Sequence, residues 1–384
     1  MDDIFHRTEL AERYAAELLD PSPASVFASG LFLAAPRRTG KSTFLREDLR
    51  PALERAGAHV LYADLWEDPA KDPGTVIVDA IRAALANREG VLARLSRVTG
   101  MDLESVSAAG ATVSLERVGL GTDVSLSQAL QALSDDVRRP IVLLLDEAQH
   151  AITSRAGSDA LYALKAARDA LNASERHGLR IVATGSSRDK LAVLRNGKGQ
   201  AFFGAPLVEF PPLDEHYVRW FLGHLARGGE VELGRAVDLF ARAGHRPEIL
   251  NAAAAALDFE LGADEDPGAR LAGLVALEIE RVDAEALGEL HALTPLQSTV
   301  LREMAERGKA FAPFEAATMS RYARTLAAID PDGERVPNTP NVQAALQALQ
   351  ERGLVWRASR GVYAIEDERY VELMRREGMI GPAA

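Results

Sequence analysis

Short apolar runs alternate, along the first half of the chain, with stretches whose apolar residues have helical spacing. Five runs rich in aliphatic residues are bounded by glycine, proline or charge, as is typical of strands in a parallel sheet. They cover residues 31–35, 59–66, 141–145, 180–184 and 205–210. Helix-forming stretches separate the runs, so the pattern predicts a parallel, doubly wound α/β domain over residues 1–212.

After residue 212 the apolar spacing is helical throughout the next segment. Amphipathic helices are expected at residues 215–226, 233–243, 247–258 and 268–287. We expect residues 213–288 to form a helical lid over the α/β domain, one that moves with ligand state.

The last part of the chain, residues 289–384, has the order helix, helix, hairpin. Thr294 is expected to cap one helix with Pro295 in its first position, and Thr339, followed by Pro340, to cap a second. Two short β-type runs then flank residues 359–361, which predicts a hairpin. This order predicts a winged-helix domain.

The segment between the second and third apolar runs is longer than one helical crossover requires. Residues 73–87 have the spacing of that crossover helix. Apolar and polar residues then alternate on both sides of residues 119–121, which predicts an inserted β-hairpin near residues 100–128. We assign no partner to this insertion.

The first apolar run leads into a sequence similar to a phosphate-binding loop. The pattern is G-x-x-x-x-G-K-[ST], and the chain has alanine at the first glycine position. Strand, glycine turn and helix in this order direct backbone N–H groups toward an anion. Lys41 would reach the β- and γ-phosphates and Ser42 would bind Mg²⁺. The expected nucleotide contacts are Ala35, Pro36, Arg37, Arg38, Thr39, Gly40, Lys41, Ser42 and Thr43.

Two carboxylates end the third apolar run and decide against a chance G-K-S match. Asp146 and Glu147 follow the buried stretch 141–145, so they are expected at the carboxyl edge of the sheet, where ligands of α/β folds bind. We assign Asp146 to Mg²⁺, through water, and Glu147 to the base that orients the attacking water. The alternative is that both residues cap the next helix.

Hydroxyl groups gather at the end of the fourth run. Thr184, Ser186 and Ser187 lie there, and one of them, for which we take Ser187, would sense the γ-phosphate. An ordinary polar turn is nearly as good an interpretation of any single serine.

These motifs together resemble the additional-strand P-loop ATPases, and within them the STAND-type, archaeal-ATPase group. The resemblance rests on "PRRTGKS", "LLLDEAQ" and "ATGSS" and covers residues 1–285. It implies ATP as the nucleotide and a strand order of 5-1-4-3-2. It also implies that an N-terminal box containing Phe5 and Arg7 lies against the adenine. The later "RAGHRPEIL" is similar to the group's G-x-P element, which would bring Pro247 to the nucleotide.

An arginine that meets the charge developing on the γ-phosphate is harder to assign. Arg188 and Arg195 follow the fourth run and would act in a neighbouring subunit, in which case specific activity would rise with protein concentration. Surface arginines are the alternative interpretation of both. His150, after the two carboxylates, is expected to pack or lie on a helix surface rather than to act in catalysis.

Composition indicates the cellular compartment in which this chemistry would take place. The chain has no cysteine, which excludes disulfides and thiolate metal sites and fits a reducing cytosol. The first ten residues lack an apolar core and no apolar run reaches the length that a bilayer requires, so we expect a cytoplasmic protein without a membrane partner.

The sequence leaves three functions open. The first is a Mg²⁺-dependent ATP-hydrolysing switch that relays its nucleotide state to a protein partner, either as a monomer or as a homo-oligomer. The second is a DNA-associated initiator or transposition ATPase. From residue 294 onward twelve Lys and Arg face twelve Asp and Glu, and DNA affinity requires excess positive charge, so DNA is not favoured. The third is a nucleotide-bound scaffold with little turnover.

Overall fold

The computed structural model describes most of the chain. The described residues are 4–20, 27, 29–86, 88, 125–173, 177–186, 188–195, 200–225, 231–260, 266–329, 337–359 and 362–381. Most of the hairpin predicted near residues 100–128 lies outside them. Its last residues are helical, since helix α7 begins at Leu126 and ends at Val137, so the predicted C-terminal limit of the hairpin is wrong.

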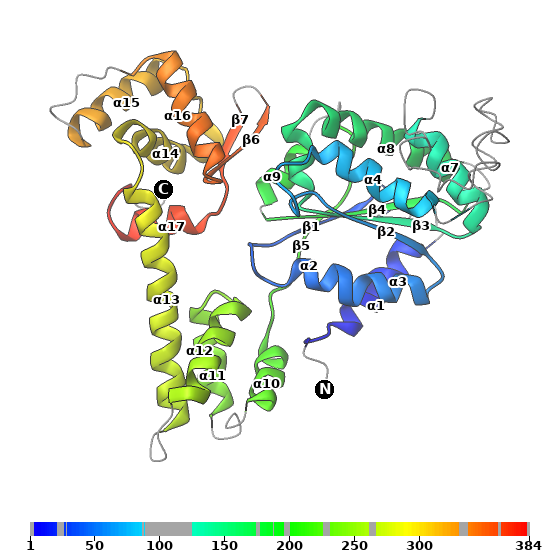
Figure 1. Cartoon of the computed structure of the whole chain (residues 1–384), viewed down its shortest axis with the longest axis horizontal. Coiled ribbons are helices and arrows are strands. Elements are labelled where there is room, and N and C mark those ends of the chain that lie inside the picture. The colour runs from blue at the N-terminus through cyan, green and yellow to red at the C-terminus, as the bar shows by residue number, and fades with distance from the viewer. Residues whose placement is uncertain are drawn as a thin grey trace, which may run out of the picture. The chain divides into compact units, whose positions relative to one another are not determined.

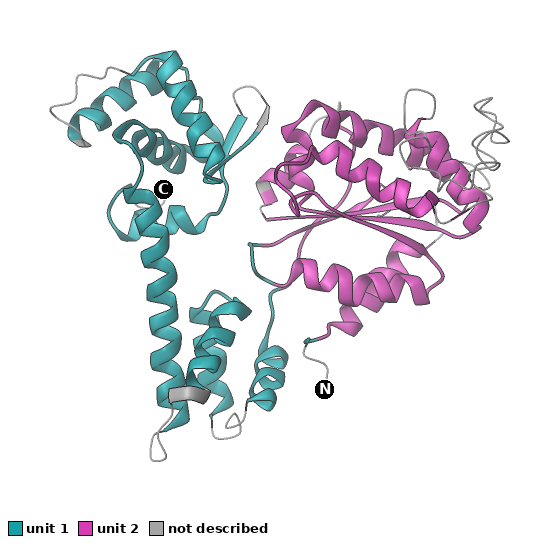
Figure 2. Cartoon of the chain, viewed as in Figure 1, with its two compact units in different colours: residues 1–5, 36–39, 212–384 teal, residues 6–35, 40–211 magenta. Residues whose placement is uncertain are grey.

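The chain divides into two compact units, shown in Figure 2. One consists of His6–Ala35 and Gly40–Pro211, and we call it the sheet unit. The other consists of Met1–Phe5, Pro36–Thr39 and Pro212–Ala384, and we call it the helical unit. Four residues of the phosphate-loop sequence therefore group with the helical unit.

The sheet unit is built on five parallel strands (Figure 1). They are β1 (Leu31–Ala34), β2 (His59–Asp64), β3 (Ile141–Asp146), β4 (Leu179–Gly185) and β5 (Leu207–Glu209). Their order is β2-β3-β4-β1-β5, which is the expected 5-1-4-3-2 read from the other edge. The predicted parallel sheet and its strand order are confirmed.

Helices cover both faces of this sheet because its strands have apolar side chains on both faces (Figure 1). In β3, Leu143 and Leu145 join one buried cluster and Val142 and Leu144 join the other. One face carries α4 (Pro73–Ala86), α7, α8 (Arg155–Ala173) and α9 (Arg188–Val193). The other carries α1 (Thr8–Leu19) and the helix that follows the phosphate loop.

That helix has three parts. It begins as α2 (Lys41–Thr43), continues as a π-helical segment η1 (Phe44–Leu49) and ends as α3 (Arg50–Arg55). The π-helical segment ends just before Pro51, the second residue of α3. Proline has no N–H to donate within a helix, so a departure from regular α-helical bonding is expected there.

The helical unit begins with the four helices of the predicted lid. They are α10 (Glu215–His224), α11 (Leu233–Arg242), α12 (Pro247–Glu260) and α13 (Pro267–His291). Their apolar faces form one cluster, and α13 extends beyond the predicted residue 287. Its later residues Ala286 and Leu290 belong to the next cluster, so one helix serves the cores of both lid and winged helix.

A winged-helix domain completes the helical unit. It contains α14 (Pro295–Arg307), α15 (Ala316–Ile329), α16 (Thr339–Glu351), the antiparallel strands β6 (Val355–Ser359) and β7 (Val362–Ile365), and α17 (Arg369–Arg376). Thr294 caps α14 as predicted and forms a capping box with Gln297. The cap of α16 is Asn338, not the predicted Thr339. Helices α15 and α17 were not predicted from the sequence. No helix of the described residues is long and apolar enough to cross a membrane.

Candidate functional site

The loop between β1 and α2 has the backbone of an anion-binding turn. Gly40 adopts a φ of 85°, and Arg38 is also left-handed with a φ of 62°. Left-handed residues placed among ordinary ones turn successive N–H groups toward one concavity, which favours an anion. Ala35, at the position of the missing glycine, has no left-handed φ, so its methyl group imposes no backbone strain.

Side chains of the loop are held by backbone carbonyls. The ammonium group of Lys41 is buried, and its Nζ donates to the carbonyl oxygen of Ala35 at 2.9 Å. The Thr39 hydroxyl donates to the carbonyl oxygen of Pro36 at 2.8 Å. Ser42, at the start of the helix, is half-buried. Both of these hydrogen bonds join residues within the loop sequence.

The carboxylate of Asp146 is fully buried at the end of β3 and accepts hydrogen bonds from both neighbouring strands. One oxygen, Oδ2, accepts from the hydroxyl of Tyr62 on β2 at 3.1 Å. The other, Oδ1, accepts from the hydroxyl of Thr184 on β4 and from the backbone N–H of Glu147. These donors fix the orientation of the side chain. Burial, followed by the charge of Asp146, raises the pKa of Tyr62 far above its ordinary value, so Tyr62 stays protonated as a donor.

Glu147 follows in an unusual backbone conformation. Its φ is 50°, a left-handed value that costs a non-glycine residue about 1 kcal/mol or more. It precedes a 3₁₀ helix, η2 (Ala148–Thr153). Its Oε2 accepts from the amide nitrogen of Gln149 at 2.5 Å, and the same nitrogen donates to the hydroxyl of Ser186 at 3.2 Å.

A third carboxylate lies at this edge of the sheet. Asp64 ends β2 in register with Asp146 on β3, and its Oδ1 accepts from the backbone N–H of Trp66 at 3.0 Å. Burial is the main cause that raises the pKa of Asp64, and the charges of Asp146 and Glu147 add to it. Sequence reasoning missed Asp64 and Tyr62 because their relevance depends on β2 lying next to β3.

The N-terminal segment contributes its predicted residues to different units. Arg7, in the sheet unit, donates to the carbonyl oxygen of Pro211 at 2.7 Å, and its guanidinium lies 4.7 Å from the centroid of the Phe210 ring. Phe5, in the helical unit, packs against Tyr217 and Trp220 with ring centroids 5.5 and 5.7 Å away. Their predicted contact with adenine stays a prediction.

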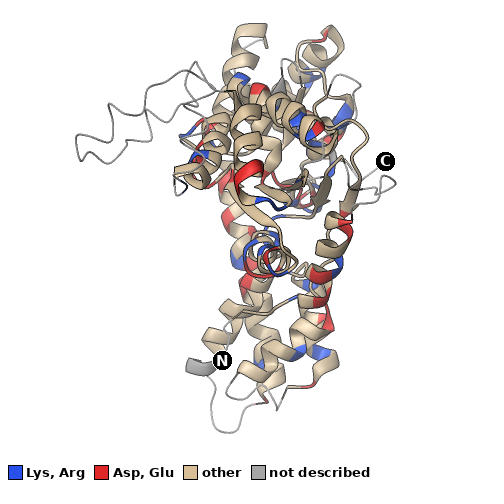
Figure 3. Cartoon of the chain, turned by 90° about the vertical axis from the view of Figure 1, so that its right-hand side faces the viewer, with Lys and Arg blue, Asp and Glu red and all other residues tan. Residues whose placement is uncertain are grey.

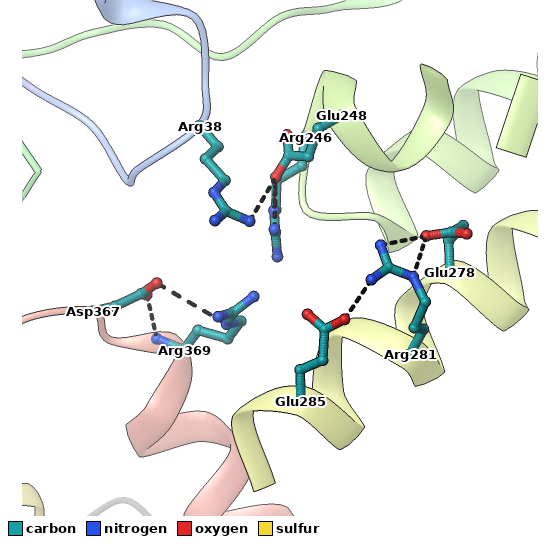
Figure 4. Close-up of polar contacts among 8 residues, drawn as sticks. All are labelled: Arg38, Arg246, Glu248, Glu278, Arg281, Glu285, Asp367 and Arg369. Atoms are coloured by element: carbon teal, nitrogen blue, oxygen red, sulfur yellow. Dashed lines mark hydrogen bonds and ion pairs between the residues drawn. The ribbon is translucent and has the colours of Figure 1, made fainter. Parts of the chain in front are cut away.

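The start of α12, where Pro247 was predicted to reach the nucleotide, carries a group of charges (Figure 4). Glu248 accepts from Arg246 at 2.6 Å and lies 3.9 Å from the guanidinium of Arg38. Arg37 pairs with the buried carboxylate of Glu366. Arg37 is therefore half-buried against Glu366 of the same unit, whereas Arg38 stays an exposed charge with a glutamate nearby.

The remaining predicted residues have separate fates. Ser187 lies outside the described residues, whereas Ser186 beside it contacts Gln149. The Arg195 guanidinium donates to the carbonyl oxygen of Ala205, an internal contact, and Arg188 is exposed at the start of α9. His150 is buried and stacks on the Trp66 ring at 4.0 Å, as a packing residue would.

The residues present fit ATP and Mg²⁺. Arg38 and Gly40 have left-handed φ values of the kind that direct backbone N–H groups toward an anion, and the buried ammonium of Lys41 follows in the same sequence. Among the described residues no group of three or more histidines and carboxylates could hold a metal by itself. Mg²⁺ prefers one or two protein ligands together with phosphate oxygens and water, and Ser42 with Asp146 offers such a set.

Comparisons with known proteins agree with the fold. No family model matches the chain, and no curated protein matches its sequence. The ORC2 protein of Aeropyrum pernix in its ADP form is a similar solved structure, with a TM-score of 0.51, 15% identity, and coverage of 98% of this chain and 94% of that chain. A Walker-type ATPase of Pyrococcus abyssi has a TM-score of 0.47 at 18% identity, with 97% of each chain covered. The Aeropyrum pernix ORC1 protein in complex with DNA has a TM-score of 0.41 at 16% identity, with 98% and 94% covered.

At these identities the likeness concerns the fold alone. The shared architecture is a five-stranded parallel sheet followed by a helical lid and a C-terminal winged helix. What the chain does must be argued from its own side chains.

Proposed function

We propose that the chain binds ATP with Mg²⁺ and hydrolyses it. One observation carries the proposal: the phosphate loop and the two carboxylates follow β1 and β3, which flank β4 in the same parallel sheet. The ends of parallel strands that point the same way meet at one edge. The loop, Asp146 and Glu147 therefore share the edge where this fold binds its ligand.

The side chains divide the work as follows. Lys41 and the loop backbone hold the phosphates, and Ser42 and Asp146 hold Mg²⁺, which neutralises the developing charge. Glu147 orients the attacking water and accepts its proton. Phe5, Arg7 and Pro247 remain our candidates for the adenine side of the site, and Ser187 for a γ-phosphate contact. This motif set favours the STAND-type group within the P-loop ATPases.

Two substitutions test the roles separately. Lys41→Ala removes the phosphate contact and should abolish binding of a fluorescent ATP analogue. Glu147→Gln keeps the size of the side chain but removes the base, so it should bind ATP normally and lose turnover by about 100-fold or more. Lys71→Ala and Glu67→Gln are matched controls, because both residues are exposed after β2. If Glu147→Gln hydrolyses ATP at the wild-type rate, Glu147 is not the base.

The lid and winged helix would relay the nucleotide state to a partner. The support is α13, whose first half packs in the lid cluster and whose last turns pack in the winged-helix cluster. Contacts from α17 tie the two further: Arg376 pairs with Asp283 at 2.6 Å, and the Tyr370 hydroxyl donates to Glu289. A displacement of the lid would therefore move the winged helix as well. Hydrogen exchange of α13 in ATP-bound Glu147→Gln and ADP-bound protein should differ; identical exchange would argue against the relay.

A DNA-associated ATPase is the second candidate. Helix α16 precedes the β6-β7 hairpin, as a DNA-reading helix does in winged helices. Gln347 on this helix and Arg352 at its C-cap are exposed. Charges of both signs occur along the helices in Figure 3. The affinity for duplex DNA, measured with and without ATP at two salt concentrations, tests this candidate. Binding weaker than about micromolar near physiological salt would remove this candidate.

A further inference from the structure

Gln149 lies at the carboxyl edge of the sheet, and none of the sequence motifs assigns it a role. It is fully buried in η2, two residues after Glu147. Burying an amide without hydrogen-bond partners costs free energy, so the bonds that Gln149 makes indicate its role. Its nitrogen donates to Glu147 and to Ser186, at 2.5 and 3.2 Å.

The orientation of this amide follows from its neighbours. The amide nitrogen of Gln149 faces Oε2 of Glu147, which accepts its N–H. One of the two N–H bonds can serve Glu147 and the other the hydroxyl of Ser186. The amide therefore joins the end of β4 to the carboxylate after β3.

The amide of Gln149 packs closely against Gly185, the last residue of β4. A methyl group on Gly185 would overlap the amide oxygen of Gln149 and the side chain of Leu191. Gly185 has no left-handed φ, so backbone conformation does not require glycine there. Glycine is required there by the close packing of Gln149 and Leu191.

We propose that Gln149 is a positioning residue for the hydrolytic base, an inference that rests on the proposed ATPase function. Its amide holds Oε2 of Glu147 and leaves Oε1 to accept the attacking water. Glu147 makes no side-chain capping bond to η2, so the bond from Gln149 is the contact that orients its carboxylate. Ser186 is the second anchor, so a change at the end of β4 would reach the base through Gln149.

Kinetics of Gln149→Met test the proposal. Methionine has a similar volume but no N–H donor, so the site stays filled while the base is released. Misplacing a catalytic group by about 1 Å can cost about 100-fold in rate. We expect kcat to fall about 10- to 100-fold while the KM for ATP and the melting temperature change little. Ser186→Ala should lower kcat in the same direction by less.

Two comparisons make the test specific. Gln131→Met is the matched control, because Gln131 also bonds a serine, Ser127, but on α7; it should leave kcat unchanged. In a Glu147→Gln background, Gln149→Met should cause little further loss, since the residue acts through Glu147.

The outcomes separate this inference from the proposed function. Wild-type protein that binds ATP without turnover overturns both. If the wild type turns over ATP and Gln149→Met has the same kcat, the positioning role alone is overturned. The same holds if Gln149→Met raises the KM for ATP and loses stability as strongly as it loses kcat. Additive losses in the double variant would also overturn it, because they would show that Gln149 acts independently of Glu147.

Discussion

The carboxyl edge of the sheet and the helix α13 both carry carboxylates, but they differ in burial. At the sheet edge Asp146 and Gln149 are fully buried and Thr184 nearly so, and each makes hydrogen bonds of defined geometry. On α13 the exposed Arg281 pairs with glutamates three residues before it and four after it (Figure 4). The comparison teaches that the number of polar contacts does not measure their importance: burial does, because solvent screens exposed pairs and cannot replace buried ones.

The largest effect is expected where a buried carboxylate loses a donor. Thr184→Val keeps the shape of the side chain and removes the hydroxyl that donates to Asp146. A hydrogen bond to a charged group contributes about 1.5–3 kcal/mol, so the free energy of unfolding should fall by about that amount in urea titrations.

The matched control is Thr299→Val on α14. Thr299 is also fully buried, but its hydroxyl donates to the neutral carbonyl oxygen of Pro295, and about 1 kcal/mol is expected. Equal losses in the two variants would break the distinction between charged and neutral acceptors.

A smaller effect of opposite sign is expected at Asp64. Its folded pKa is raised by burial, so the folded state binds more protons than the unfolded state between the unfolded value, about 3.9, and the folded one. Stability therefore falls as pH rises through that window. Asp64→Asn keeps the acceptor for Trp66 and removes the charge, so it should be more stable than the wild type near neutral pH.

Denaturation at two pH values checks the sign. The advantage of Asp64→Asn should disappear below about pH 4, where the wild-type carboxyl is protonated in both states. Asp68→Asn is the control, since Asp68 accepts from the backbone N–H of Ala70 in the same way but is exposed. A stabilisation that persists in acid would show that charge is not the cause.

The smallest effect is expected on α13. Arg281→Ala removes an exposed guanidinium that contacts Glu278 and Glu285. Solvent and salt screen these pairs, so the melting temperature should stay within the error of the measurement. A clear loss at low salt that vanishes at high salt would show that the helix depends on its ion pairs.

Much of this architecture follows from local sequence patterns. The five strands occur where apolar runs predict them, and Thr294 caps α14 because its side chain and Gln297 lie one helical turn apart. Local patterns failed where another local choice was better, as at Asn338, which caps α16 in place of Thr339. They also missed α15 and α17, whose neighbours in the winged-helix core come from distant parts of the chain.

The sequence by itself determined the elements and the chemical groups that end them: the loop with Lys41 and the strand with Asp146 and Glu147. Only the tertiary structure decided which side chains hold those groups. Tyr62 reaches Asp146 across 84 residues of chain, and Thr184 reaches it from the other neighbouring strand. Such contacts depend on strand order and register, which arise when distant segments bury their apolar faces together. Spacing along the chain carries no record of that pairing.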